Sequence, residues 1–332
     1  MNSIVIPQDG LIFSWVMSES ESGFELPLSG GEELVLSPDQ SVWLHLNYSN
    51  AFVQKWLKTL PFITESMLEV ISEDVSRNRF KSLPLLDNAL LMFFNDFQQV
   101  FASESQDDIV TLWAIVNPKV FITLRAHPVQ TADILRMQVK SGRVNPRSTA
   151  ELFRLILDTR EELLHQFTNH LLEQMEDLEE IIIRGNDLPE HETLGRIRIK
   201  CNKLRRYFTP ELSALTKIGR HPPEWFSSSD HSEIVEYSEK LSNLVQEVNY
   251  LYERAKVLQD EQAAHIAEFN AKNLHVLSVM TVIFLPMTLI TGIMGMNMED
   301  LPGLKGSFSE VMFLMFFAGL FIYVALKLRK II

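Results

Sequence analysis

The residues best suited to chemistry in this 332-residue chain are neutral oxygen donors that accompany a long apolar run. Asn297 ends the triplet Gly295-Met296-Asn297 at the end of this run, and its side-chain carbonyl could hold a hydrated cation without trapping it. Gly295 allows the tight backbone turn that a helix end needs, and Met296 is a packing residue or a soft contact. This chemistry is typical of cation passage rather than catalysis.

The element that must position these residues is an apolar helix. Leu274–Met294 carries no formal charge if His275 is neutral, and at about 1.5 Å per residue it can cross a hydrocarbon core roughly 30 Å thick. A second apolar run, Val311–Leu326, follows after a short loop. The two runs predict a pair of transmembrane helices, and a buried core hairpin of a soluble protein is the alternative.

Charges around the two runs predict the orientation of the chain. The last run is followed by a basic tail, residues 327–332, whereas the loop 295–310 carries Glu299 and Asp300 with a single lysine. By the positive-inside rule, the loop faces outward and both termini face the cytoplasm. The start of the chain shows no basic region followed by an apolar core, so we expect no signal peptide and a cytosolic N-terminal part.

Composition excludes several classes of protein. The chain is 46% apolar with a net charge of −13, and all of the acidic excess lies before residue 273. Such a chain is poorly suited to nucleic acid and compatible with attracting cations. Cys201 is the single cysteine, which excludes an intrachain disulfide and a tetra-cysteine zinc site. We find no nucleophile motif, phosphate loop or paired carboxylates, so we expect no catalytic residues and no cofactor.

Residues 1–147 are predicted to form a mixed α/β domain, because short apolar runs bounded by Gly, Pro, Ser and Asp alternate with helical patterns. The expected strands are Leu11–Val16, Val42–Leu46, Ala89–Phe94, Ile109–Val116 and Val120–Leu124, and the expected helices are Ala51–Leu60, Glu65–Asp74 and Thr131–Ser141. The turn Asn117-Pro118-Lys119 suits a hairpin. His45 and His127 have no partner at ligand spacing, and we expect structural roles for them.

A helical hairpin is predicted for residues 148–228. Ser148 and Glu151 have the spacing of a capping box, and a helix of about ten turns follows to Gly185. Pro189 suits the first turn of the return helix, which Pro210 should kink or interrupt. Residues 217–225 are expected to form a loop.

A stalk helix is predicted for residues 229–273, continuing into the first membrane run at 274–294. Its apolar positions alternate spacings of three and four, at Leu241, Leu244, Val248, Leu251, Ala255, Leu258, Gln262, His265 and Phe269. This heptad repeat predicts packing against parallel copies of the same helix.

Several motifs together resemble a known family. Phe284-Leu285-Pro286 lies within the first membrane run, Gly295-Met296-Asn297 closes it, and Leu301-Pro302-Gly303 lies in the outer loop. Trp43–Tyr48 and Leu204–Tyr207 with Pro210 extend the likeness over nearly the whole chain. The sequence resembles the CorA family of divalent metal ion transporters, and within it is most similar to the zinc-transporting ZntB branch. One departure is Met294, where the family usually has an aromatic residue.

The resemblance implies a fold and an assembly. It implies an α+β cytosolic part, a helical hairpin with a stalk helix, and two C-terminal transmembrane helices in a funnel-shaped homopentamer. The first span would line the pore and the second would face lipid. Stepping along the first span by three or four residues gives one candidate pore-lining face: Asn270, Leu274, Leu277, Thr281, Leu285 and Thr288. The alternative is that this stripe packs on a neighbouring helix.

The transported ion is predicted less directly. Oxygen and apolar side chains suit a hydrated ion such as Mg²⁺, whereas the resemblance favours Zn²⁺ uptake across a bacterial inner membrane, with Mg²⁺, Co²⁺, Ni²⁺ and Cd²⁺ as other candidates. Glu299 and Asp300 could concentrate cations at the entrance or simply be solvated. Proton coupling would have to use Glu299, Asp300, Glu310, His265 or His275. The alternatives are a Mg²⁺ or Co²⁺ channel and a membrane-tethered cytosolic sensor that transports nothing.

Overall fold

A computed structural model of the chain describes residues 3–27, 30–72, 85–86, 89–98, 109–184, 191–294 and 308–329. The chain divides into two compact units, Met1–Leu258 and Gln259–Ile332. Helix α6 (Ser228–Met294) is a single helix of 67 residues, as the sequence predicted, and contributes to both units. The observed elements agree with the α/β domain, the long helix and the two C-terminal apolar helices that the sequence predicted.

The first unit is built on a seven-stranded sheet in the order β3-β2-β5-β9-β8-β7-β6. Its strands are β2 (Leu11–Ser18), β3 (Phe24–Glu25), β5 (Gln40–Asn47), β6 (Leu85–Leu86), β7 (Ala89–Phe97), β8 (Ile109–Val116) and β9 (Val120–Arg125). Only β5 and β9 pair in parallel. A separate ribbon joins β1 (Ser3–Val5) and β4 (Glu33–Val35). All five predicted strands are confirmed, with extensions of up to three residues.

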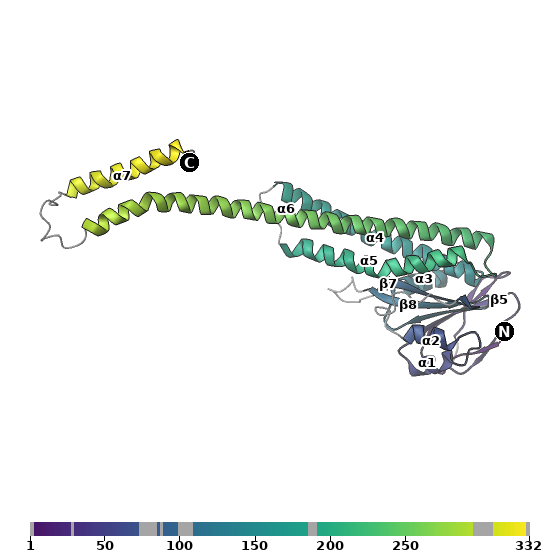
Figure 1. The fold of residues 1–332 in the computed structure, drawn as a ribbon. Coiled ribbons are helices and arrows are strands. Elements are labelled where there is room, and N and C mark those ends of the chain that lie inside the picture. The colour runs from purple at the N-terminus through teal and green to yellow at the C-terminus, as the bar shows by residue number, and fades with distance from the viewer. Residues whose placement is uncertain are drawn as a thin grey trace. The chain divides into compact units, whose positions relative to one another are not determined.

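Helices cover both faces of this sheet (Figure 1). On one side lie α1 (Ala51–Leu57) and α2 (Glu65–Ser72), and on the other lie α3 (Gln130–Lys140), α4 (Thr149–Arg184) and α5 (His191–Arg220) together with α6. Neighbouring residues of a strand point to opposite faces, so each strand feeds two separate cores. In β5, for example, Trp43 packs with the α3–α6 layer while Leu44 packs with α1 and α2.

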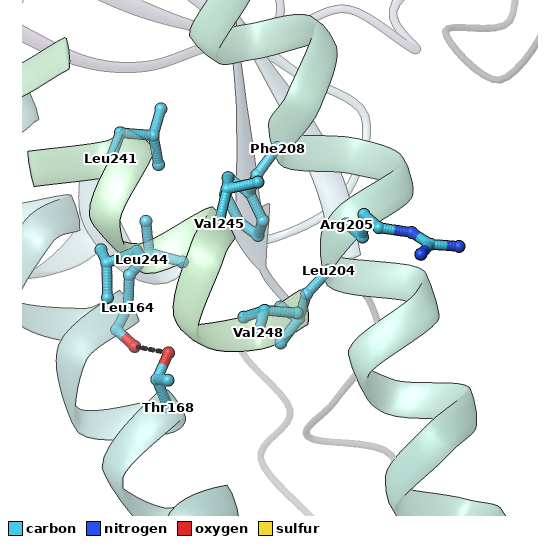
Figure 2. Close-up of a pocket in the computed structure, with 9 residues that line it drawn as sticks. All are labelled: Leu164, Thr168, Leu204, Arg205, Phe208, Leu241, Leu244, Val245 and Val248. Carbon is cyan, nitrogen blue, oxygen red and sulfur yellow. Dashed lines mark hydrogen bonds between the residues drawn. The ribbon is translucent and has the colours of Figure 1, made fainter. Parts of the chain in front are cut away.

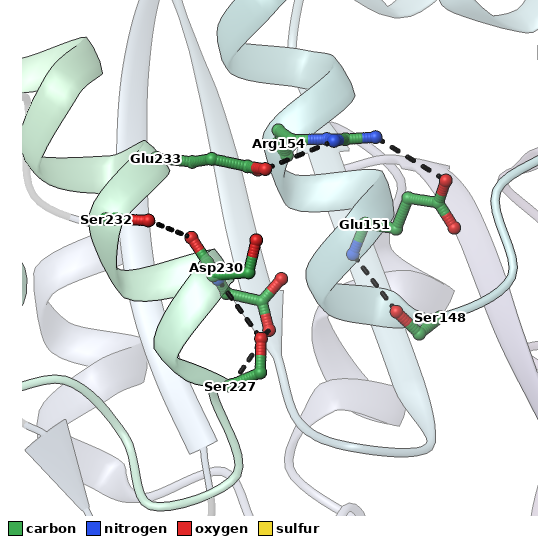
Figure 3. Close-up of polar contacts among 8 residues, drawn as sticks. Ser148, Glu151, Arg154, Ser227, Asp230, Ser232 and Glu233 are labelled. Atoms are coloured by element: carbon green, nitrogen blue, oxygen red, sulfur yellow. Dashed lines mark hydrogen bonds and ion pairs between the residues drawn. The ribbon is translucent and has the colours of Figure 1, made fainter.

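Serine caps begin two of the long helices (Figure 3). The Ser148 hydroxyl accepts the Glu151 backbone N–H at 3.1 Å, as the predicted capping box requires. At the start of α6, the Ser227 hydroxyl accepts the Asp230 N–H at 3.1 Å, and the Asp230 carboxylate accepts the Ser227 N–H at 2.9 Å. Arg154 joins the two helix starts through ion pairs with Glu151 at 3.5 Å and Glu233 at 3.3 Å. These contacts fix where α4 and α6 begin.

The predicted interruption of the return helix at Pro210 is not observed. Helix α5 runs through Pro210 to Arg220, so the expected loop starts only at His221. Phe208 and Leu215, on either side of the proline, are both buried in the core. Their packing outweighs the local cost of a missing N–H. Gly185, predicted to end the first helix of the hairpin, and Pro189, predicted to begin the return helix, are outside the described residues.

The predicted partner of the heptad seam on α6 is wrong for its first half. Leu241, Val248, Leu251, Ala255 and Leu258 are at most 5% exposed, in one core with apolar residues of α4 and α5 of the same chain. Parallel copies therefore cannot occupy this seam. The repeat specifies an apolar stripe but not its partner, and here the hairpin supplies the partner. His265 and Phe269, further along, are exposed.

Candidate ion pathway in the membrane unit

The second unit contains the C-terminal half of α6 and α7 (Phe308–Leu328). Both helices include stretches long and apolar enough to cross a membrane, with almost none of their side chains buried inside the chain. The predicted spans 274–294 and 311–326 lie within these two helices. Apolar side chains that remain exposed in this way need lipid or other copies of the chain around them.

Helix α6 touches α7 along one side. A side-chain Cβ placed at Gly319 would collide with the Met287 methyl group, so glycine permits this close approach. The half-buried residues of this part of α6 follow the same side as Met287: they are Val279, Ile283, Pro286, Met287 and Ile290. One side of the first span is therefore covered by the second span.

The predicted pore-lining residues occupy the other side of α6. Asn270, Leu274, Leu277, Thr281, Leu285 and Thr288 are all exposed. At about 100° of rotation per residue, the centre of this stripe lies roughly 180° around the helix from the side that meets α7. Within one chain the stripe therefore does not pack on α7, and it stays available to whatever surrounds the helix.

Hydroxyl groups on this part of α6 share one orientation. Thr281 donates to the Leu277 carbonyl at 2.8 Å, Thr288 donates to the Phe284 carbonyl at 2.9 Å, and Ser278 donates in the same way. Each hydroxyl proton is thus directed to the backbone one turn earlier, which leaves the oxygen lone pairs pointing away from the helix. A surface of such oxygens accepts hydrogen bonds from water around a cation.

The residues predicted for selectivity and entry lie outside the described residues. These are Gly295, Met296, Asn297, Glu299 and Asp300. The candidates for proton coupling that are described, His265, His275 and Glu310, are all exposed on α6 or α7.

Among the described residues, no group of three or more His, Cys, Asp or Glu side chains could hold a metal ion. A cavity of about 10 Å³ lies between α4, α5 and α6, lined mainly by leucine and valine, with the Arg205 guanidinium pointing away from it (Figure 2). This volume is about that of one water molecule, and the lining is apolar, so the cavity is a packing gap and not a ligand site.

Sequence reasoning missed a buried polar cluster in the first unit. Arg160 of α4 forms an ion pair with Glu211 of α5, donates to the Asn95 carbonyl of β7 at 2.7 Å, and donates to the Tyr237 hydroxyl of α6 at 3.0 Å. Glu211 also accepts the Asn95 backbone N–H at 2.9 Å. All four residues are at most 4% exposed. One arginine therefore ties α6 to the sheet and to both hairpin helices.

Charge and burial compete within this cluster. Burial raises the pKa of Glu211, and the charge of Arg160 opposes that shift. Burial acts to lower the pKa of Arg160, but the charges of Glu211 and Asp96 outweigh it, and the net shift is upward. The hydrogen bonds from Asn95 to Glu211 also favour the carboxylate and oppose the upward shift of its pKa.

His45 lies in the core of the sheet. Its Nδ1 is 2.7 Å from the Thr123 hydroxyl, and burial lowers its pKa from 6.5 to about 3. The imidazole is therefore neutral at neutral pH. This location agrees with the structural role predicted for it.

A sequence model described as "CorA-like Mg2+ transporter protein" matches residues 38–330. The chain belongs to this CorA family. It is 25% identical over 295 residues to the divalent cation transporter CmaX of Pseudomonas aeruginosa, covering 89% of this chain and 88% of CmaX. It is 23% identical over 321 residues to the zinc transport protein ZntB of Yersinia enterocolitica, covering 94% and 95%.

Solved structures agree with this fold. The structure of full-length CmaX has a TM-score of 0.78 at 22% identity and covers 97% of this chain and 98% of its own. The CorA magnesium transporter from Methanocaldococcus jannaschii has a TM-score of 0.72 at 16% identity and covers 95% and 98%. The family and fold predicted from the sequence motifs are confirmed, and these relatives are transporters rather than enzymes.

Proposed function

We propose that this CorA-family chain carries Zn²⁺ into the cytoplasm across a bacterial inner membrane, through a pore formed by five copies. The observation that carries the proposal is the exposed stripe on α6, which lies opposite the side that α7 covers and presents hydroxyl oxygens. Two spans cannot enclose a pore, but a ring of copies can do so if each contributes this stripe. Residues 1–273 would form the cytosolic funnel, and both termini would be cytoplasmic.

Residues at successive levels of the stripe would have different roles along the pore. Leu274 and Leu277 would form apolar collars that close by excluding water, and the oxygens of Thr281 and Thr288 would contact the hydration shell of the ion. Asn297, within Gly295-Met296-Asn297, would form a ring of carbonyl dipoles at the outer mouth. Glu299 and Asp300 would concentrate cations outside that ring.

The choice of Zn²⁺ as the transported ion rests on the ZntB relatives. Other observations favour Mg²⁺. The acceptor oxygens and leucines on α6 suit an ion that keeps its water shell, such as Mg²⁺. The matching family model is also described as a Mg²⁺ transporter. A Mg²⁺ or Co²⁺ channel is therefore the alternative. If several divalent ions pass through the same pore, both the Zn²⁺ proposal and this alternative would hold. A sensor that transports nothing is the further alternative.

Flux through the purified protein tests the proposal. Proteoliposomes with an internal zinc dye should show saturable Zn²⁺ entry, which Asn297→Ala and Thr281→Val alter and excess Mg²⁺ barely inhibits. Thr291→Val is the matched control, because its hydroxyl lies to the side of the stripe. Robust Mg²⁺ flux without Zn²⁺ entry would move the protein to the magnesium branch, and no flux from an assembled oligomer would favour the sensor. Equal Zn²⁺ entry with and without a pH gradient would exclude proton coupling.

A further inference from the structure

The outward faces of α4 and α5 carry charges of opposite sign. Beyond Arg154, every exposed charged residue of α4 up to Ile182, where the described side chains of this helix end, is acidic: Asp158, Glu162, Glu173, Glu176, Asp177 and Glu180. On the described exposed surface of α5, every charged residue is basic: Arg196, Lys203, Arg205, Arg206, Lys217 and Arg220. Glu211 is the one acidic side chain between residues 193 and 220, and it is buried. We call these surfaces the acidic face and the basic face.

The two faces have matching lengths and positions along the bundle. The Arg160–Glu211 ion pair fixes the antiparallel register of α4 and α5, and Leu164 and Phe208 line the same cavity, in agreement with it (Figure 2). At about 1.5 Å per residue, Glu176 lies about 24 Å beyond Arg160, and Arg196 lies about 22 Å beyond Glu211 in the same direction. The strongest acidic cluster is therefore level with the start of the basic face.

We propose that the acidic face of one copy docks on the basic face of the next copy in the oligomer. This inference rests on the homo-oligomer of the proposed function and names the surfaces that join its cytosolic parts. A two-fold axis that pairs α4 with α4 would bring two acidic faces together, and their charges would repel. Pairing α4 with the neighbour's α5 brings opposite charges together and leaves an acidic face at one end of the assembly and a basic face at the other, so addition continues until a ring closes.

A second copy fits these faces better than another partner does. The chain has a net charge of −13, so it repels polyanions such as nucleic acid as a whole. Among the described residues, the acidic face of the same chain complements the basic face in length, level and charge. Ile199, 61% exposed within the basic face, adds an apolar contact. Exposed charges of this kind give direction and specificity more than affinity, and salt weakens them.

Cysteine cross-linking in the full-length protein tests the pairing. In a Cys201→Ala background, one copy carries Glu176→Cys and a co-expressed copy carries Arg196→Cys, and a short bis-maleimide is added. We expect cross-linked dimers in the mixture, none from either variant alone, and a several-fold lower yield at high salt. The matched control pairs Arg196→Cys with Glu162→Cys, which lies about 21 Å away along α4 and should not cross-link.

Charge reversal provides a second measurement. Glu173→Lys with Asp177→Lys in both copies should lower the cross-link yield, as should Lys203→Glu with Arg206→Glu, and combining the four changes should restore it. Absence of the cross-link in a protein that native mass spectrometry shows to be oligomeric would overturn the inference and leave the proposed function standing. A monomer would instead contradict the proposed pore.

Two further results would also overturn the pairing. Cross-linking of the Glu176→Cys variant with itself would show that like surfaces meet. Protection of Arg196→Cys from maleimide by vesicles containing phosphatidylglycerol, without the cross-link, would assign the basic face to anionic lipid.

Discussion

The two segments of α6 follow different rules although they belong to one helix. In Ser228–Leu258, apolar residues form a stripe that is buried on α4 and α5, and most of the remaining residues are polar and at least partly exposed. From Leu274 onward, apolar residues surround the helix and nearly all are exposed within the chain. The period of apolar residues thus identifies a helix that packs in water, and their continuous run identifies a helix placed in lipid.

The largest effect is expected from replacing Arg160, the arginine that links the first segment of α6 to the sheet. Arg160→Met should lower the free energy of unfolding of the first unit by about 3–5 kcal/mol, because it leaves Glu211 buried without its partner. Arg154→Met is the control and should cost at most about 1 kcal/mol, since its side chain is 38% exposed. Thermal unfolding can be followed by a thiol-reactive dye on Cys201, which is buried and the only cysteine. Equal losses in the two variants would contradict the account of the cluster.

Truncating one leucine in each segment of α6 tests whether the two segments differ in their effect on stability and on ion flux. Leu251→Ala should cost about 2–5 kcal/mol, because it opens a cavity among α4, α5 and α6. Leu277→Ala should leave the unfolding of the first unit unchanged, since Leu277 is 63% exposed, and should change ion flux instead. Both variants can be measured by the same dye assay and by flux. A loss of stability in Leu277→Ala similar to that in Leu251→Ala would contradict the division.

The response to pH should also come from the first unit. His45 titrates near 6.5 when unfolded and near 3 when folded, so only the unfolded state gains a proton between these values. The stabilising contribution of neutral His45 to the free energy of unfolding is fully present above pH 6.5. Below that, the free energy of unfolding falls by up to about 1.4 kcal/mol per pH unit as the pH drops toward 3. His45→Gln should therefore show a shallower loss of melting temperature from pH 7 to 5 than the native protein. The exposed His221→Gln should follow the native curve, and identical curves for all three would refute the assignment.

The smallest expected effect concerns the narrow contact between α6 and α7. Gly319→Val should push against Met287 and cost about 1–3 kcal/mol of packing, with reduced flux. Met287→Ala in the same chain should restore flux by making room. Gly292→Ala is the control, because nothing lies within 4 Å of its added carbon. Failure of Met287→Ala to rescue would show that the two helices do not meet there.

Much of the fold was predictable because it depends on local patterns. The strands, the start of α4 at Ser148 and the length of α6 follow from apolar period, capping residues and the absence of glycine. The partner of the α6 stripe was not predictable, since a stripe at spacings of three and four fits a copy of itself or a hairpin equally well.

The Arg160 cluster was missed because a charged residue on a helix is usually solvated. A sign was nevertheless present in the sequence. Arg160 stands four residues after Ile156 and four before Leu164, inside the apolar stripe, and Glu211 and Tyr237 interrupt the stripes of their helices in the same way. The predicted pore residues remain predictions, since oxygen orientation on α6 supports them while the selectivity triplet lies outside the described residues.

The outermost strands of the sheet, β3 and β6, are each two residues long. Outermost strands this short offer a neighbouring sheet little regular edge to extend. In a chain that assembles with its own copies, as proposed above, this disfavours joining strand to strand. The proposed docking of α4 on α5 of the next copy would instead leave every strand of the sheet in place.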